Sequence, residues 1–238
     1  LTKELNHIVD YYEKNNENLF TIVELEENVG LGLALNEGLK ACRNELVARM
    51  DTDDLSVENR CELQVNEFEK NKNLSILGSS IAEFEDSPDK IMSARVVPTK
   101  HQDIVNFSRR RNPFNHPTVM YKKSEVLKVG GYGDYRRNQD LDLFVRMLQN
   151  GCIAKNLEQP LVLFRANREN LKRRKSWTKC SSYIGMIYNF WKKGHSRLSD
   201  LIIVAISQII VFLAPAIFLD WLSSNFLRKQ HLKKESGL

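Results

Sequence analysis

Three aspartates in the segment VARMDTDDLS, residues 47–56, are the first candidates for chemistry. Asp51, Asp53 and Asp54 directly follow an apolar run, and like charges at this spacing repel one another unless a cation, a helix cap or solvent relieves them. Strand alternation places Arg49 and Asp51 on the same face. Two carboxylates one residue apart at the end of a strand suit a hard divalent cation held against a diphosphate.

The same aspartates also have a structural interpretation. Asp53 or Asp54 caps a helix that begins near Val57, and the other carboxylates face solvent. The position favours chemistry, because ligands of parallel α/β sheets bind at the carboxyl ends of strands. The sequence therefore predicts a metal and phosphate oxygens opposite the cluster.

A second candidate set lies in YRRNQDLDLFVRML, residues 135–148. Asp140 stands at the start of a predicted helix, where it acts as the N-cap or is free for acid–base chemistry if it points into a cleft. Asp142 and Arg146 are spaced i,i+4, as in a helical ion pair. We therefore predict a structural role for Asp142.

His116 lies between Pro113 and Pro117, which hold the backbone stiffly. Three interpretations stay open: a metal ligand, a contact to an acceptor hydroxyl, or a hydrogen bond within the loop. The following glycine-rich segment GGYGDY, residues 130–135, is either a turn or a functional loop, which would serve as a lid or as an acceptor wall.

The glycines of NVGLGLALN match only part of a dinucleotide-binding motif. Gly30 and Gly32 fit the G-x-G part, but Leu35 stands where the third glycine belongs, so we reject that function. The segment is typical of a turn that enters a helix, with Asn28 able to form a local hydrogen bond.

Hydrophobic periodicity predicts an α/β protein in which helices and strands alternate. The expected helices cover residues 1–15, 28–44, 57–71 and 141–151, the last closed by Gly151. The expected strands cover residues 19–25, 45–50, 74–86 and 160–166, and residues 112–124 are expected to form a loop that runs into a strand. This order favours a largely parallel sheet.

Charge and cysteine content limit the partners and the compartment. The net charge is +5, and the basic clusters at 191–197 and 228–234 flank a hydrophobic segment, which favours an anionic membrane surface over nucleic acid. The four cysteines show no metal-like spacing. We interpret them as reduced thiols of a cytoplasmic protein.

The segment DLIIVAISQIIVFLAPAIFLDWL, residues 200–222, is apolar enough in sequence to span a bilayer. Trp191 and Trp221 lie near its two ends, as interfacial aromatic residues often do. The alternatives are a buried helix packed on the domain, a helical hairpin, or an in-plane helix broken at Pro215.

Taken in order, NVGLGLALNEGL, ARMDTDD, NPFNHPTVMYKKS, GGYGDY and NQDLDLFVRML resemble the family 2 glycosyltransferases, in particular the amylovoran-type branch of bacterial exopolysaccharide and lipopolysaccharide synthesis. The resemblance covers about residues 1–167. It implies a GT-A fold, with a mostly parallel sheet flanked by helices. Residues 168–199 are then a basic helical linker, 200–222 the membrane segment and 223–238 a basic tail.

The resemblance implies an inverting transfer from a nucleotide sugar to a saccharide, such as one linked to a polyprenyl diphosphate, at the cytoplasmic face of the bacterial inner membrane. It assigns Asp51 and Asp53 to Mg²⁺ or Mn²⁺, and Asp140 to the general base. The residues expected to bind the donor are Asn28, Gly30, Arg49 and Asp51. The residues expected to bind the acceptor are His116, Gly131 and Tyr132.

Two departures from the family pattern accompany the resemblance. The family's N-terminal nucleoside-binding segment is not found in this sequence, so we expect an N-terminally truncated polypeptide that is itself inactive. Gln139 replaces the glutamate that usually precedes the catalytic aspartate. The rival hypotheses are an inert membrane-associated binding remnant and a nucleotidyltransferase.

Overall fold

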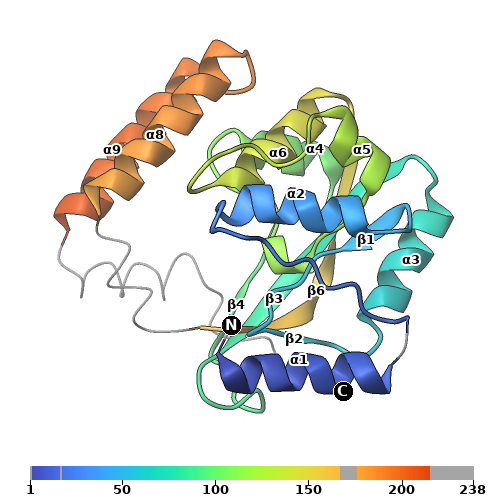
Figure 1. Ribbon diagram of the computed structural model, residues 1–238. Coiled ribbons are helices and arrows are strands. Elements are labelled where there is room, and N and C mark those ends of the chain that lie inside the picture. The colour runs from blue at the N-terminus through green and yellow to red at the C-terminus, as the bar shows by residue number, and fades with distance from the viewer. Residues whose placement is uncertain (1, 17, 167–175, 215–238) are drawn as a thin grey trace.

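The computed structural model describes residues 2–16, 18–166 and 176–214. Its strands form one six-stranded sheet with the order β1-β5-β3-β6-β2, and β4 pairs with β3 outside this path. The strands, visible in Figure 1, are β1 (Leu46–Ala48), β2 (Leu55–Ser56), β3 (Leu74–Phe84), β4 (Ser93–Arg95), β5 (Met120–Lys122) and β6 (Ile153–Arg165).

The sheet is mixed, so the prediction of a mostly parallel sheet is wrong. Among the described pairings, β3 and β6 run parallel, whereas β1–β5, β3–β5, β3–β4 and β2–β6 run antiparallel. Hydrophobic periodicity identifies a strand but carries no information about its direction or its neighbour. The pairing of β5 between β1 and β3 is a long-range choice that local sequence does not encode.

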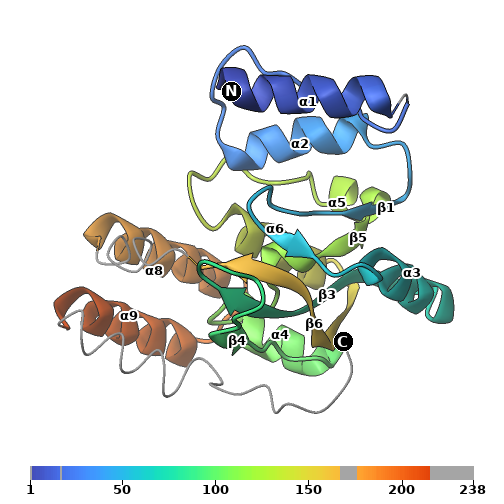
Figure 2. The same cartoon turned by 90° about the horizontal axis from the view of Figure 1, so that it is seen from below.

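Helices cover the sheet on two sides. The α-helices of the described ranges are α1 (Lys3–Asn15), α2 (Leu31–Ala41), α3 (Arg60–Lys70), α4 (His101–Ser108), α5 (Lys123–Lys128), α6 (Gln139–Gln149), α8 (Trp177–Lys192) and α9 (Leu198–Leu213), and the last two lie beside the sheet. Figure 2 shows α1 and α2 on one side of β3 and β6, and α4 on the other. The helices predicted near 1–15, 28–44, 57–71 and 141–151 are confirmed, and Gly151 adopts a φ of 81° after the last turn of α6.

The strand predicted over residues 19–25 is wrong. This segment pairs with none of the described strands. Its apolar side chains are exposed, for example Leu19 at 72% and Phe20 at 44%. β-propensity reflects the fit of a side chain to a half-buried sheet, so without a neighbouring strand it does not produce one.

The core lies between β3 and α6 and fixes the start of α6 relative to the sheet. Every residue of β3 is buried, and Leu143, Phe144 and Met147 of α6 are fully buried. Phe144 meets Phe114 edge to face, with ring centroids 4.9 Å apart. Truncating a buried phenylalanine to alanine costs about 3–5 kcal/mol, so this contact is a strong anchor for the helix that carries Asp140.

Helices α8 and α9 lie side by side as a hairpin (Figures 1 and 2). Met186, Ile187 and Phe190 of α8 and Val204 of α9 pack with residues of α6 in one hydrophobic cluster. The described part of the predicted linker 168–199 is thus mostly helix α8, attached to the domain through a core of its own.

The membrane segment predicted at 200–222 is described only as far as residue 214. None of the helices in the described ranges is both long enough and apolar enough to cross a bilayer. Within the described part of this segment the chain forms the single helix α9, and the alternatives of a hairpin within 200–222 or of a helix broken at Pro215 stay predictions. The predicted tail 223–238 lies outside the described residues, and the four cysteines are free, as predicted.

Candidate active site

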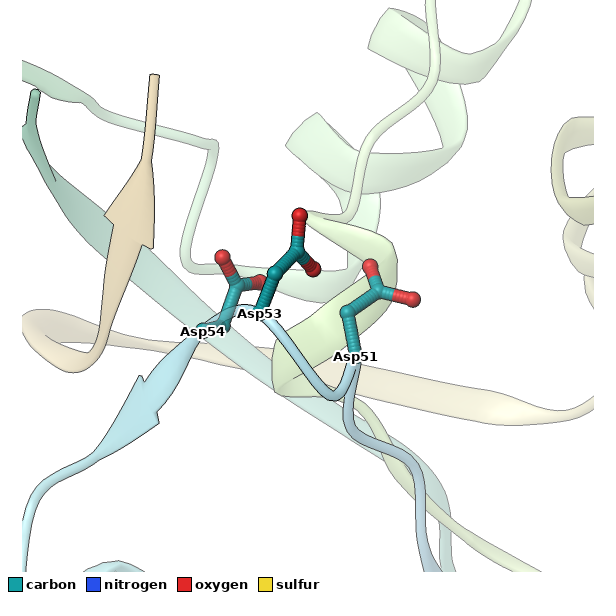
Figure 3. A group of neighbouring side chains, drawn as sticks. All are labelled: Asp51, Asp53 and Asp54. Carbon is teal, nitrogen blue, oxygen red and sulfur yellow. The ribbon is translucent and has the colours of Figure 1, made fainter. Parts of the chain in front are cut away.

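The three aspartates gather on the loop between β1 and β2. Figure 3 shows the carboxylates of Asp51, Asp53 and Asp54 projecting from the same side of this loop. Ligand oxygens from the three residues all lie within 4.8 Å of one another. Asp53 is exposed, Asp51 is partly buried and Asp54 is buried.

Arg49 binds Asp51 through both terminal nitrogens of its guanidinium group. Arg49 Nη1 donates to Asp51 Oδ2 at 2.6 Å, and Nη2 donates to Oδ1. The arginine itself is only 7% exposed, and its carbonyl oxygen accepts a hydrogen bond of 2.8 Å from Arg60 Nη2. A bidentate, charge-assisted pair fixes geometry as well as charge. The predicted proximity of Arg49 and Asp51 is therefore confirmed.

Asp54 does not cap a helix, so the structural interpretation of the cluster is wrong for this residue. Its Oδ1 accepts a hydrogen bond of 3.0 Å from the backbone N–H of Arg165, while its buried Oδ2 has no hydrogen-bond partner among the described residues. The helix that follows begins only at Arg60. Burial, followed by the charges of Asp51 and Asp53, raises the pKa of Asp54 to about 6.

These aspartates fit a hard divalent cation. Mg²⁺ and Mn²⁺ prefer oxygen ligands, and the cluster supplies carboxylates alone. Because Arg49 engages both oxygens of Asp51, Asp53 and the unpartnered Oδ2 of Asp54 are the groups with the most free ligand capacity. Asp54 is thus a candidate ligand that sequence reasoning missed by treating it as a cap.

Asp140 occupies the first turn of α6 but is not its N-cap. That position belongs to Asn138, which has a left-handed backbone with φ 58°. Asn112 Nδ2 donates a hydrogen bond of 2.6 Å to Asp140 Oδ2. Burial raises the pKa of Asp140, and nearby backbone N–H groups together with Arg95 and Arg49 offset part of this shift. A carboxylate with a raised pKa at a helix start is suited to accept a proton.

Asp142 has the structural role that its spacing predicts. Its carboxylate lies 2.6 Å from Arg146 Nη2 and is 5% exposed. Arg146 also donates to the carbonyl oxygens of Val129 and Gly131, the latter at 2.8 Å. The pair therefore fastens the glycine-rich loop to α6 and leaves Asp140 as the aspartate available for chemistry.

The partly buried His116 pairs with the buried Tyr132. His116 Nε2 lies 3.0 Å from the Tyr132 hydroxyl, and the tyrosine is 2% exposed. Burial, followed by the charge of Arg49, lowers the pKa of His116 to about 3, so the imidazole is neutral. The interpretation of His116 as a residue that hydrogen-bonds locally is supported, and the candidate metal group found in the described ranges does not include it.

The loop at 130–135 is anchored rather than free. Asn36 donates to the Tyr132 carbonyl oxygen and accepts from the Tyr132 N–H, both at 2.8 Å. Gly131 has a φ of 70°, and a Cβ there would lie 2.5 Å from Asn36 Oδ1. This favours a fixed wall over a lid. The acceptor roles of His116, Gly131 and Tyr132 stay predictions.

The glycines of NVGLGLALN have local structural reasons. Asn28 Oδ1 accepts a hydrogen bond of 3.0 Å from the Gly30 N–H, as predicted, and Gly30 precedes α2 with φ 85°. A Cβ on Gly32 would lie 2.7 Å from the Gly133 carbonyl oxygen, so glycine allows α2 to approach that loop. The donor roles of Asn28 and Gly30 stay predictions.

Arg49 links the two acidic motifs. It binds Asp51 directly, and its charge also lowers the pKa of Asp140. The two aspartates therefore lie within electrostatic range of one buried arginine, although 89 positions separate them in the sequence.

The sequence analysis gave no role in the site to Arg60, Arg95, Asn112 and Arg165, and it named Asp54 in the acidic cluster without assigning it to the metal. Arg60 and Asn112 act through contacts to residues 11 and 28 positions away. No local pattern signals such contacts. For Asp54, its place beside Asp53 was the available signal.

Comparisons with known proteins agree with this geometry. Residues 2–130 match the family model described as "Glycosyl transferase family 2". The chain is 37% identical over 230 residues to "UDP-Gal:alpha-D-GlcNAc-diphosphoundecaprenol beta-1,3-galactosyltransferase" of Escherichia coli, covering 96% of this chain and 82% of that protein. It is 34% identical to "Amylovoran biosynthesis glycosyltransferase AmsE" of Erwinia amylovora, covering 68% of this chain and 60% of that protein.

A solved structure shares the fold. The mannosyltransferase PcManGT from Pyrobaculum calidifontis, in complex with GDP-Man and Mn²⁺, superposes with a TM-score of 0.57 at 13% identity, covering 93% of this chain and 67% of that chain. The fold is therefore GT-A-like, and the resemblance inferred from the ordered motifs is confirmed. The chain belongs to glycosyl transferase family 2.

Proposed function

We propose that the protein transfers a sugar, with inversion, from a UDP-sugar to a saccharide linked to a polyprenyl diphosphate, in the synthesis of a bacterial surface polysaccharide. The E. coli relative named above, which uses UDP-Gal and a diphosphoundecaprenol-linked acceptor by its name, supports the donor and acceptor classes. The observation that carries the proposal is the position of Arg49. This residue forms an ion pair with Asp51, and its charge lowers the pKa of Asp140.

Asp140 is the general base in this proposal. Its carboxylate takes the proton of an acceptor hydroxyl, and the hydroxyl oxygen attacks the anomeric carbon of the donor sugar. The bond between that carbon and the diphosphate oxygen breaks, and the nucleoside diphosphate leaves with the electron pair. Asn112, which donates to Asp140 Oδ2, holds the carboxylate in place for this step.

In this proposal the aspartates at 51–54 bind the diphosphate group of the donor through a metal cation. Asp53 and Asp54 hold Mg²⁺ or Mn²⁺, and Arg49 keeps Asp51 beside them. When bound, such a cation stabilises the departing diphosphate as a Lewis acid. Asn28 and Gly30 at the start of α2 complete the proposed donor side, and His116, Gly131 and Tyr132 form the proposed acceptor wall.

A transfer assay tests this function. The protein is incubated with Mn²⁺, with UDP-galactose or other UDP-sugars in turn, and with N-acetylglucosamine linked through an α-diphosphate to an alkyl chain. We expect a disaccharide whose new linkage has the opposite anomeric configuration to the donor, measured by NMR. Metal-dependent UDP binding without transfer to any acceptor would favour the inert remnant.

We also propose that the hairpin lies on the cytoplasmic membrane surface. The outer side of α9 exposes Ile202, Ile206 and Ile209 at 50%, 53% and 44%, and exposed aromatic residues of α8 include Trp177 and Trp191. Large exposed apolar patches mark interaction surfaces, and amphipathic helices with interfacial tryptophans bind membranes in the plane.

Vesicle co-sedimentation tests the membrane surface. Binding to vesicles of phosphatidylethanolamine and phosphatidylglycerol should fall several-fold in the double variant Ile206→Gln and Ile209→Gln. Leu127→Gln on α5, where the leucine is 51% exposed, is the matched control and should bind as the wild type does. Equal binding of both variants would contradict a membrane role for α9.

A further inference from the structure

The segment from Arg109 to Asn112 connects the helical hairpin to the proposed base. Ser196 Oγ donates to the Arg109 carbonyl oxygen at 2.8 Å, and the Tyr183 hydroxyl donates to the Arg110 carbonyl oxygen at 2.8 Å. At the other end, the Asn112 amide reaches Asp140 at 2.6 Å. The segment therefore passes from the hairpin to the catalytic carboxylate within a few residues.

Not all arginines here have an acidic partner. Arg110 Nε lies 2.5 Å from Asp200 Oδ1 at the start of α9, so its charge is neutralised. In the described ranges, no ion pair involves Arg95 or Arg111. Arg95 Nη2 donates to the Asn112 carbonyl oxygen at 3.2 Å, and Arg111 lies over the Phe107 ring at 5.3 Å.

Arg95 and Arg111 meet at the same short segment, because Arg95 Nη2 donates to the carbonyl oxygen of Asn112, the residue that directly follows Arg111. Burial and then the charge of Arg111 lower the pKa of Arg95, and the charges of Asp140 and Glu83 offset part of this shift. Both arginines also lower the pKa of Tyr183, which burial raises to about 12 overall. Two neighbouring guanidinium groups, one partly buried, are stabilised by an anion placed between them.

We propose that Arg95 and Arg111 form a subsite for the phosphate groups of the acceptor, adjacent to Asp140. The inference rests on the proposed function and identifies the residues that bind the phosphate groups of its acceptor. The order in space, from the apolar hairpin to the arginines to Asp140, matches the order of lipid chain, diphosphate and sugar in such an acceptor. Guanidinium groups bind phosphate oxygens bidentately.

Calorimetry with farnesyl diphosphate in EDTA tests the subsite without donor, metal or catalysis. Because a charge-assisted hydrogen bond contributes about 1.5–3 kcal/mol, we expect Arg111→Gln to weaken binding by about tenfold or more. Arg95→Gln should do the same, and Arg95→Lys should retain part of the affinity. Arg43→Gln, at an exposed arginine before β1, and Asp53→Asn should bind as the wild type does.

Arg111 is exposed, so its variant decides the question even if Arg95→Gln fails to fold. Wild-type affinity in Arg111→Gln would overturn the subsite. The subsite would also be overturned if Arg111→Gln lost binding to phosphatidylglycerol vesicles as strongly as it lost binding to farnesyl diphosphate. The arginines would then bind lipid headgroups and not the acceptor specifically.

The transfer assay separates the subsite from the proposed function. If the wild type glycosylates the diphosphate-linked sugar and the same sugar on a plain alkyl chain equally well, the subsite is wrong and the function stands. If farnesyl diphosphate binds in an Arg111-dependent manner but no sugar is transferred, the function is wrong and the subsite stands.

Discussion

Two regions of the molecule present aspartates to the site, and their surroundings differ. On the β1–β2 loop, Asp51, Asp53 and Asp54 stand together, and Asp53 is exposed to solvent. At the start of α6, Asp140 is partly buried, and the described hydrogen bond to its carboxylate comes from the neutral amide of Asn112. Clustered carboxylates favour a cation, whereas a desolvated carboxylate favours a proton.

The difference in surroundings supports the two roles proposed for these aspartates. Repulsion between neighbouring carboxylates on the loop is relieved in part by Arg49, and in the proposed function a divalent cation relieves the rest. Burial of Asp140 raises its pKa toward the range of a useful base. The following predictions test this contrast, starting with the largest expected effect.

Asp140→Asn should remove transfer while leaving donor binding unchanged. An amide of the same size cannot accept the proton, so we expect the transfer rate to fall by at least about 10²–10⁴-fold, the usual contribution of a general base. Transfer kinetics and calorimetry with UDP and Mn²⁺ measure the two properties separately. Asp103→Asn, at an exposed aspartate of α4, is the matched control.

Asp53→Asn should weaken donor binding, the property that Asp140→Asn is expected to leave unchanged. Losing an anionic ligand weakens the cation site, so Mn²⁺-dependent UDP affinity should fall by about tenfold or more, since one strong charged contact contributes about 1.5–3 kcal/mol. UDP binding measured in EDTA should not change. If Asp53→Asn and Asp140→Asn lost metal-dependent binding equally, the two regions would not have distinct roles.

Asp142→Asn should affect stability rather than chemistry, even though Asp142 lies two residues from Asp140. It leaves the Arg146 guanidinium without its carboxylate, and breaking a buried pair costs about 3 kcal/mol or more. Urea unfolding measures the free energy. The pair of Lys128 and the partly buried Glu125 gives the comparison, because Lys128 is exposed and Lys128→Gln should therefore cost much less than Asp142→Asn.

Asn112→Ala should shift the pH dependence of transfer. Transfer needs the Asp140 carboxylate, so the rate falls as pH drops through its pKa, which lies above the ordinary 3.8. Removing the amide that stabilises the anion raises this pKa further, so the acidic limb should move to higher pH. Rate profiles of Asn112→Ala and of Asn73→Ala, an exposed control, check this. Superimposable acidic limbs would exclude this role for Asn112.

The sequence by itself determined the features that depend on neighbours along the chain. The periodicity of α3 and α6, the ion pair of Asp142 with Arg146 and the end of α6 at Gly151 all follow from local rules. The ordered motifs also indicated the family, because each motif keeps its own short-range pattern.

Only the tertiary structure decided the features that depend on distant partners. The sheet is mixed because β5 pairs antiparallel with both β1 and β3, and residues 19–25 form no strand in the absence of a described partner. The contact of Asn112 with Asp140 spans 28 positions. Such pairings depend on which surfaces meet once the chain is compact, and this information does not lie in the periodicity of any single segment.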